Sequence, residues 1–446
     1  MMEHAQSVQQ RQKRNLILFI VSYVINNLAS GILYDTYVNY LQEVSLPTAT
    51  SFWAFYGYAT FLSAFILLLV PKSGYKKLLL FCAAATSAAF FCVVYIKSEM
   101  VFYLSTLLAL TGVQLHFIML APYVAAYADH AGGKSIDWYT RTYYMGYVGY
   151  FLTTFLGGAA TVKLFSVHAG FSYAEAKAQT AYIAEVSESV RTAYLDGNRD
   201  VLILTGIATL LSILPILFIH EKKEDYAAVK EETEQKQSLR ERARDIISVL
   251  FRKDALMYLL YWALISFAMG LFTSYYTVFL NRNLHIDKAT ASLLVSISYA
   301  AIVLFMLFTP YVVKKLGTVG TICFTVLLSV PFMLIIANGD RFGKAMIPMV
   351  GIGLFMRAGL ANLGSPAESS LSMMIAPKHL RPAFTSVVNF MAGIVSIISG
   401  NFTGKFLFAT QEGYRSAYYI AAALYFLAAL VMVTLFQKYN RKEEEA

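Results

Sequence analysis

Long runs of apolar residues, separated by short polar or charged intervals, dominate the pattern of this 446-residue chain. An α-helix rises about 1.5 Å per residue, so roughly 20 apolar residues cross the hydrocarbon core of a bilayer. The pattern therefore predicts an all-α polytopic membrane protein with twelve transmembrane helices. The runs fall at 15–41, 51–70, 76–96, 101–128, 139–165, 200–219, 255–280, 289–313, 318–338, 345–375, 382–409 and 416–437.

Composition supports this class and excludes several others. Hydrophobic residues make up 58% of the chain and charged residues only 14%, whereas soluble domains are about a quarter charged. The net charge of +9 lies in the loops, so it does not indicate nucleic-acid binding. Cys82, Cys92 and Cys323 lie inside apolar runs without a CxxC motif, and HExxH, GxSxG and P-loop motifs are absent. We expect no enzyme activity, no metal and no cofactor.

The distribution of Lys and Arg predicts the orientation in the membrane. Loops on the side of the termini carry more than twice as many Lys and Arg as loops on the opposite side. The positive-inside rule then places both termini in the cytoplasm, in the plasma (cytoplasmic or inner) membrane. The expected domains are an N-terminal segment 1–14, a six-helix bundle 15–219 with an extracytoplasmic loop 166–199, a charged linker 220–254, a second bundle 255–437 and a cytoplasmic tail 438–446.

An internal repeat relates the two predicted bundles. Five landmarks in the first bundle recur in the second at a nearly constant offset of 239 to 243 residues, which predicts two pseudo-symmetric six-helix halves. The pairs are Gly31 with Gly270, Gly74 with Gly317, His116 with Arg357, Asp129 with Glu368, and Arg141 with Arg381.

With these residues, the chain resembles the major facilitator superfamily over all twelve spans and the central loop. The basic turn Lys72-x-Gly74-x-Lys76-Lys77 after span 2 and its counterpart Lys315-x-Gly317 after span 8 carry the resemblance. The family's cytoplasmic motif has an Asp three residues before the Gly, where this chain has Pro71 and Lys314. The glycine-proline signature of many drug antiporters is also absent from span 5. The resemblance implies the family's fold, with spans 1, 4, 7 and 10 lining a central cavity.

Three ionisable residues lie well inside the predicted spans, on helices that the resemblance places at the cavity: Asp35, His116 and Arg357. A charge at this depth costs several kcal/mol unless it faces water or a partner, so a functional role is the default interpretation. Asp35 and His116 are the candidate proton-coupling residues, although Asp35 alternatively lies at the outer interface and His116 is alternatively a neutral hydrogen-bonded residue. Arg357 either binds an anionic group of the substrate or serves as counter-ion to Asp35; a static structural pair is the alternative.

Polar and tyrosine side chains recur at helical spacing on the same predicted spans. They suit amphipathic, aromatic or sugar-like solutes equally. Together with Arg357, the candidate substrate-binding residues are Asn27, Tyr34, Tyr123, Thr273 and Thr277.

Charged residues at the cytoplasmic ends of the spans form a second candidate group. Asp129 with Arg141 and Glu368 with Arg381 are expected to form inner-gate salt bridges, one in each half. Lys72 and Lys315 of the basic turns complete the predicted gating set.

These patterns favour a secondary active transporter that moves a small organic solute by alternating access, coupled to protons. Export of amphipathic compounds is slightly preferred, and proton-coupled uptake of a small organic anion or sugar-like solute is the alternative. The expected partners are the solute, protons and the lipid bilayer, without nucleic acid, and the protein is expected to be a monomer.

Overall fold

The computed structural model describes residues 2–67, 69–131, 135–223, 225, 244, 247, 250–376 and 381–440. Eleven helices in this part of the chain are long and apolar enough to cross a membrane, and Phe52–Leu67 is a shorter apolar helix. Each of these twelve helices covers most of one predicted span, which confirms the predicted twelve-helix membrane architecture. The sixth span begins earlier than its apolar run suggests, because helix α10 (Glu188–Leu211) already starts in the predicted outer loop.

The chain forms two compact units. Six residues from the second half of the sequence belong to the first unit. Unit 1 comprises Met1–Gln235 together with Asp287–Ser292, and unit 2 comprises Lys236–Ile286 and Leu293–Ala446. Residues 287–292 include the beginning of helix α16 (Lys288–Met306), whose remainder belongs to unit 2. This six-residue segment, called the α16 start below, packs with the first half of the chain.

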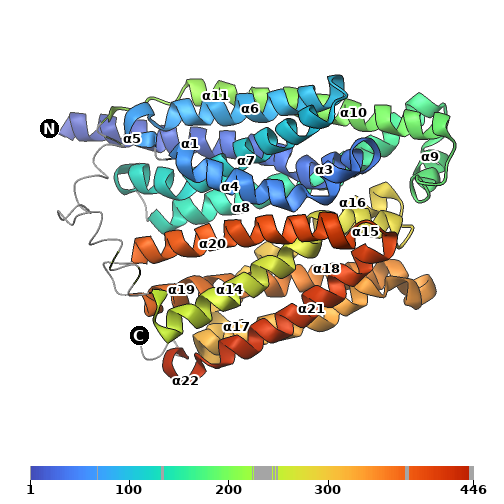
Figure 1. The fold of residues 1–446 in the computed structure, drawn as a ribbon. Helices are drawn as coiled ribbons and strands as arrows, with labels where there is room; N and C mark the ends of the chain where they lie inside the picture. The colour runs from blue at the N-terminus through green and yellow to red at the C-terminus, as the bar shows by residue number, and fades with distance from the viewer. Residues whose placement is uncertain are drawn as a thin grey trace. The chain divides into compact units, whose positions relative to one another are not determined.

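In unit 1, the long helices α1, α6, α7 and α8 run alongside one another, with α10 packed against α6 and α8 (Figure 1). A short helix, α9, lies between α8 and α10. The helices are α1 (Met2–Ile32), a π-helical turn (Leu33–Tyr37), α2 (Val38–Val44), α3 (Leu46–Thr50), α4 (Phe52–Leu67), α5 (Val70–Ser73), α6 (Tyr75–Tyr95), α7 (Glu99–Ala131), α8 (Ser135–Ala169), α9 (Tyr173–Thr180), α10 (Glu188–Leu211) and α11 (Ile213–Leu217).

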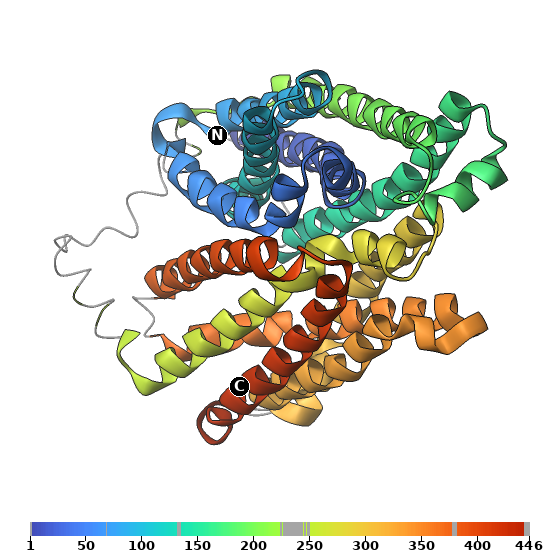
Figure 2. The same cartoon turned by 45° about the vertical axis from the view of Figure 1, so that its right-hand side comes forward.

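In unit 2, helices α14, α17 and α21 pack side by side, and α18 lies against α17 (Figure 2). The helices are α14 (Lys253–Phe272), a 3₁₀ turn (Thr273–Tyr275), α15 (Tyr276–Arg282), α16 (Lys288–Met306), α17 (Thr309–Ala337), a second 3₁₀ segment (Gly339–Ala345), α18 (Met346–Leu363), α19 (Ser365–Ile375), α20 (Arg381–Phe402), a π-helical turn (Thr403–Leu407), α21 (Gln411–Val433) and α22 (Phe436–Tyr439).

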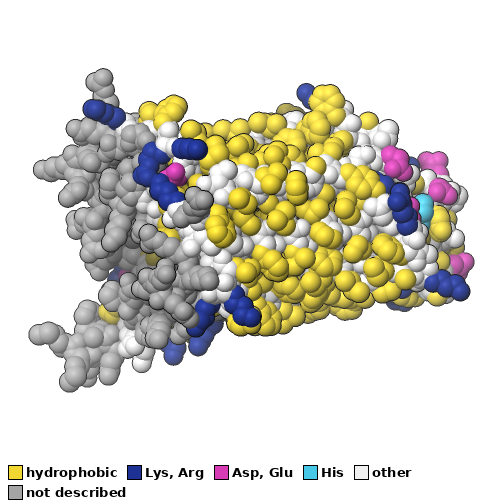
Figure 3. Space-filling view, turned by 90° about the horizontal axis from the view of Figure 1, so that it is seen from below, with side chains coloured by type: hydrophobic (Ala, Val, Ile, Leu, Met, Phe, Trp, Pro, Cys, Tyr) yellow, Lys and Arg dark blue, Asp and Glu magenta, His cyan; other side chains and the backbone are white. Residues whose placement is uncertain are grey.

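The exposed surface is apolar along the middle of the helices. Figure 3 shows hydrophobic side chains covering the helical middle, with Lys, Arg, Asp and Glu toward the ends. Many large hydrophobic side chains are exposed, among them Phe65, Leu156 and Leu430. In water such a surface would drive aggregation, but in lipid it is solvated by the acyl chains. The distribution therefore fits an integral membrane protein.

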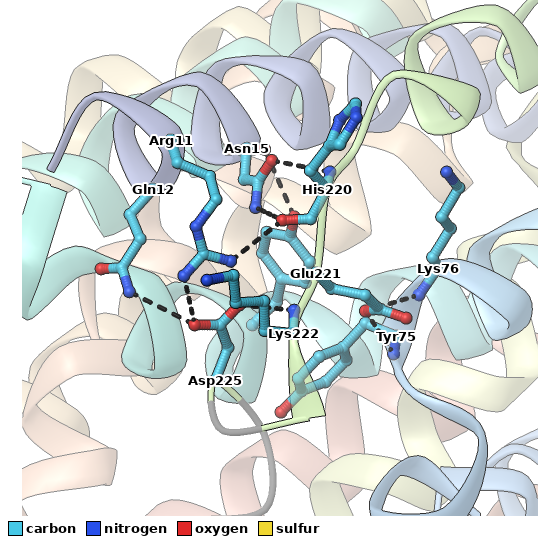
Figure 4. A network of polar contacts seen from close by, with 10 residues as sticks. Arg11, Gln12, Asn15, Tyr75, Lys76, His220, Glu221, Lys222 and Asp225 are labelled. Carbon is cyan, nitrogen blue, oxygen red and sulfur yellow. Dashed lines mark hydrogen bonds and ion pairs between the residues drawn. The ribbon is translucent and has the colours of Figure 1, made fainter. Parts of the chain in front are cut away.

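Each unit contains the same sharp turn directly before its third predicted span. Gly74 before α6 has φ +77°, and Gly317 within α17 has φ +76°, conformations that favour glycine. In unit 1, the Glu221 carboxylate accepts the backbone N–H groups of Tyr75 and Lys76 at 3.0 and 3.1 Å (Figure 4). In unit 2, Asn440 Oδ1 accepts the N–H of Gly320 at 2.9 Å. A residue that follows the last helix of each unit thus binds this turn, so the repeat extends to the polar contacts.

The first residues of the predicted linker are anchored to unit 1. Arg11 of α1 forms an ion pair with Asp225 at 2.6 Å, and Asn15 donates to the His220 carbonyl at 2.8 Å (Figure 4). Burial raises the pKa of the neighbouring Glu221, and its two backbone hydrogen bonds oppose that shift. The beginning of the predicted linker 220–254 is thus held against α1 and α6 by His220, Glu221 and Asp225.

We expect Gly74→Ala to lower the thermal unfolding temperature of the purified protein. The new Cβ would lie 2.1 Å from Glu221 Oε1, and alanine disfavours the backbone conformation by about 1–3 kcal/mol. Gly170→Ala is the matched control, because Gly170 also has positive φ but no atom lies within 4 Å of a Cβ added there. Equal losses for the two variants would contradict a tight contact between Glu221 and the turn.

Candidate functional site

The first long helix of each unit is interrupted at equivalent positions. In unit 1, α1 passes into the π-helical turn Leu33–Tyr37, which contains Asp35. In unit 2, α14 ends in the 3₁₀ turn Thr273–Tyr275, which contains Ser274, the repeat counterpart of Asp35. Such interruptions are frequent at functional sites and free backbone groups inside a membrane helix. The two interrupted segments are therefore candidate positions for polar functional residues.

Asp35 forms a buried ion pair with Lys288, which lies between two predicted spans. Its Oδ1 lies 2.5 Å from the ammonium nitrogen of Lys288, and its Oδ2 accepts a hydrogen bond from Ser292 at 2.8 Å. The Lys288 side chain is 0% exposed and that of Asp35 is 1% exposed. All three residues belong to unit 1, since Lys288 and Ser292 are part of the α16 start. Asp35 is therefore buried within unit 1.

The sequence pattern could not identify Lys288. A lysine directly before an apolar run ordinarily marks the end of a span, where its charge reaches water. Here the lysine is the first residue of α16 and lies against Asp35. Within unit 1, the cation that contacts Asp35 is Lys288, and the pairing of Asp35 with Arg357 of unit 2 stays a prediction.

Arg357 lies in a box of aromatic side chains within unit 2. Its guanidinium donates to the hydroxyl groups of Tyr276 at 2.8 Å and Tyr425 at 2.7 Å, and lies 4.6 Å from the ring centre of Phe272. The side chain is 5% exposed. Within the described residues, neither Arg357 Nε nor the nearby Tyr418 hydroxyl has a hydrogen-bond partner, and no carboxylate pairs with Arg357. The box therefore holds a buried cation that retains the capacity to bind an anion.

His116 on α7 is buried among aromatic rings. Its ring centre lies 5.5 Å from those of Phe19 and Tyr23, and Nε2 has no hydrogen-bond partner among the described residues. An imidazolium in these surroundings would carry a buried charge without a counter-ion. The geometry therefore favours the neutral form, the alternative already open from the sequence.

Glu368 on α19 is buried and bonded to tyrosines. Its carboxylate accepts a hydrogen bond from the Tyr261 hydroxyl, and its carbonyl accepts one from Tyr258 at 3.0 Å. Within the part of the chain that the structure describes, Glu368 has no ion-pair partner. The predicted salt bridge to Arg381 lies outside the described side chains, as does that between Asp129 and Arg141, because Arg381 and Asp129 are not described beyond their helices.

Three basic residues of the predicted gating set, Lys72, Arg141 and Lys315, are exposed. Arg141 lies 5.6 Å from the ring centre of Trp138, and Lys315 lies 4.6 Å from that of Tyr311. Lys72 is exposed on α5. Their cationic groups therefore lie at the surface of the units rather than in buried pairs.

The remaining predicted substrate residues are distributed over both units. In unit 1, Asn27 donates to the Tyr23 carbonyl at 2.8 Å, Tyr34 stacks on Tyr150, and Tyr123 stacks on Phe19. In unit 2, Thr273 begins the 3₁₀ turn and Thr277 is buried on α15. Asn27 and Tyr123 are thus engaged in internal contacts of unit 1. Thr273 Oγ1 is a buried hydroxyl without a hydrogen-bond partner among the described residues.

A duplicated helical membrane fold with buried charges in its interrupted helices is typical of secondary transporters. The family model of the major facilitator superfamily matches residues 193–399 and 263–446, which together cover more than half of the chain. The chain belongs to the major facilitator superfamily. It is therefore a membrane transporter and not an enzyme.

Solved structures with the same fold include transporters of different solutes. A crystal structure of the nucleoside transporter NupG is 14% identical with a TM-score of 0.71 and covers 95% of this chain and 99% of its own. The D-xylose–proton symporter is 14% identical with a TM-score of 0.64, covering 96% and 98%. A bacterial homologue of the lysosomal transporter Spinster is 16% identical with a TM-score of 0.67, covering 95% and 98%. No curated protein matches the chain. These likenesses show the fold and leave the solute open.

We expect Lys288→Met to destabilise the folded protein strongly, because it leaves the Asp35 carboxylate buried without a cation. Removing one partner of a buried ion pair costs about 3–5 kcal/mol. The double variant Asp35→Asn/Lys288→Met should recover most of this loss, since neither charge remains. Thermal unfolding of the purified variants measures the effect. Losses that simply add in the double variant would show that the two residues do not interact.

Proposed function

We propose that this protein is a proton-coupled secondary active transporter that moves a small organic solute by alternating access. The observation that carries the proposal is the buried ion pair between Asp35 and Lys288. The fold supports proton coupling, because a protein with the same fold is described as a D-xylose–proton symporter. In the proposed mechanism, Asp35 takes up and releases the transported proton.

The coupling follows from the energetics of a buried charge. While Asp35 is ionised, its attraction to Lys288 and the Ser292 hydrogen bond hold the α16 start in place. A proton on Asp35 removes that attraction and leaves the Lys288 ammonium buried without an anion, which costs several kcal/mol. The lysine is then driven toward water, and the α16 start leaves with it. Proton binding thereby changes the relative stability of two conformations, which is the requirement for coupling.

We propose the orientation that the positive-inside rule predicts, with both termini on the cytoplasmic side of a plasma (cytoplasmic or inner) membrane. Asp35 lies near the end of the span Val8–Val44 that is opposite to the N-terminus. The ion pair then controls access from the outer side. Release of the α16 start would open that side to water and to the solute.

Two classes of solute are candidates: an amphipathic compound that is exported, and a small organic anion that is taken up. The small organic anion has a specific observation in its favour. Arg357 favours the anion, because it is a buried cation that no described carboxylate neutralises. Its Nε also has no hydrogen-bond partner among the described residues. A carboxylate or phosphate group would accept hydrogen bonds from the guanidinium in a paired geometry. The competing solute class is an amphipathic compound that the protein exports, and the tyrosine side chains around Arg357 support it.

We expect Asp35→Asn to abolish transport driven by a pH gradient, because the amide cannot take up the proton. The assay is a panel of labelled nucleosides, sugars, organic acids and amphipathic cations in proteoliposomes with an imposed pH gradient. Asp200→Asn is the control, since its carboxylate is 40% exposed and pairs with His168. Gradient-driven transport that survives in Asp35→Asn would refute the proton role. Solute exchange without a gradient should persist in this variant.

Arg357→Lys should weaken binding of an anionic solute about tenfold or more, because lysine lacks the paired donors of the guanidinium. Transport of the best solute in the panel is measured as a function of its concentration. Arg415→Lys is the matched control in unit 2, where Arg415 pairs with the partly exposed Asp340 at 2.9 Å. An unchanged half-saturating concentration in Arg357→Lys would exclude the anion-binding role and favour an amphipathic solute.

A further inference from the structure

The segment between α8 and α10 has no role in the mechanism above, yet it contacts the α16 start at several points. We propose that α9 and its neighbours form a cradle that positions Lys288 for Asp35. Thr180 and Asp287 are the positioning residues of this cradle. This inference rests on the proposed function for its significance, while the docking of the α16 start is tested without transport. The position of α9 can be seen at the right of Figure 1.

Thr180 binds the backbone of Lys288 itself. Its Oγ1 accepts the Lys288 N–H at 3.0 Å, and the Thr180 side chain is fully buried. The first N–H groups of a helix have no partner within the helix, and Lys288 is the first residue of α16. Thr180 therefore supplies the missing acceptor at the residue whose side chain reaches Asp35. A shift of α9 would carry the backbone of Lys288 with it.

Asp287 connects the same helix end to α9 through its charge. Its Oδ1 accepts the N–H of Thr290 at 2.9 Å, which caps α16, and its Oδ2 lies 3.8 Å from the Lys177 ammonium. The cap fixes the helix to begin at Lys288 rather than a residue later. The ion pair then ties that beginning to α9.

Apolar packing completes the cradle. Ala289 packs against a buried cluster formed by α8, α9, α10 and the turn after α9, which contains Phe165, Ala176 and Ile183. Gly158 of α8 allows close approach, because a Cβ there would lie 2.3 Å from the Cβ and Oγ of Ser292. Hydrogen bonds, charge and packing thus all act on the α16 start.

These contacts fix the backbone of Lys288 in one position. Thr180 Oγ1 holds the N–H of Lys288 itself, and Asp287 Oδ1 holds the N–H of Thr290, two residues further along the helix. The ammonium therefore reaches Asp35 from a fixed origin, which minimises the conformational entropy lost on forming the pair. When protonation of Asp35 weakens the pair, the cradle contacts determine how readily the segment leaves.

The experiment measures exposure of the α16 start by thiol labelling of purified, full-length protein. The background carries Cys82→Ala, Cys92→Ala and Cys323→Ala, and Ala289→Cys supplies the reporter. We expect Thr180→Val to raise the rate of maleimide labelling about three- to tenfold, as for the loss of one buried hydrogen bond. Thr180→Ser retains the acceptor and should restore the slow rate.

Thr192→Val is the matched control, because Thr192 Oγ1 bonds to the carbonyl of Glu188 in its own helix. Its labelling rate should equal that of the background. Equal rates for Thr180→Val and Thr192→Val would overturn the inference, as would fast labelling in Thr180→Ser. If Thr180→Val does not fold, the labelling rate of Lys177→Gln tests the cradle instead. The Lys177 side chain is partly exposed, so this substitution should not disturb folding. An unchanged labelling rate in Lys177→Gln would refute the cradle.

The two proposals fail separately. Slow labelling in Thr180→Val together with loss of gradient-driven transport in Asp35→Asn would refute the cradle and leave the proton role intact. Fast labelling in Thr180→Val together with intact gradient-driven transport in Asp35→Asn would refute the proton role. In that case α9 holds the α16 start for a purpose other than proton coupling.

Discussion

The high cost of burying a charge away from water is the constraint on which the proposed mechanism depends. Asp35 and Lys288 are both almost completely buried, and each is tolerated only because the other is present. The pair is therefore stable as a unit and unstable when either charge is neutralised. A proton is the smallest species that can neutralise one partner, so the same interaction that holds the α16 start also makes it responsive to protons.

The two units solve the same structural problems with different residues. Both interrupt their first long helix, but unit 1 places Asp35 there and unit 2 places Ser274. Both bind the turn before their third predicted span by a side chain after the last helix, an acid in unit 1 and an amide in unit 2. Duplication preserved the backbone arrangement, while the charges became specialised: an acid–lysine pair in unit 1 and an aromatic-bound arginine in unit 2.

The pattern of apolar runs was sufficient to predict the twelve helices, because the bilayer fixes the length of each span. Landmarks at a constant offset, such as Gly74 and Gly317 at the turns, predicted the duplication. The apolar pattern also drew attention to Asp35 and Arg357, since isolated charges inside apolar runs are rare. It missed Lys288 and the contacts of Glu221, which stand at the ends of runs and look like ordinary loop residues. Their partners lie 253 and about 145 residues away in the sequence, and a single sequence gives no signal for such pairs.

The central claim is that protonation of Asp35 and release of the α16 start are one event. Infrared difference spectroscopy of the purified protein during acidification reports the protonated carboxyl group, with Asp35→Asn identifying its band, and thiol labelling at Ala289→Cys reports release. The account predicts that the two signals change over the same pH range. Release of the segment while Asp35 stays ionised, or protonation while the segment stays docked, would contradict it.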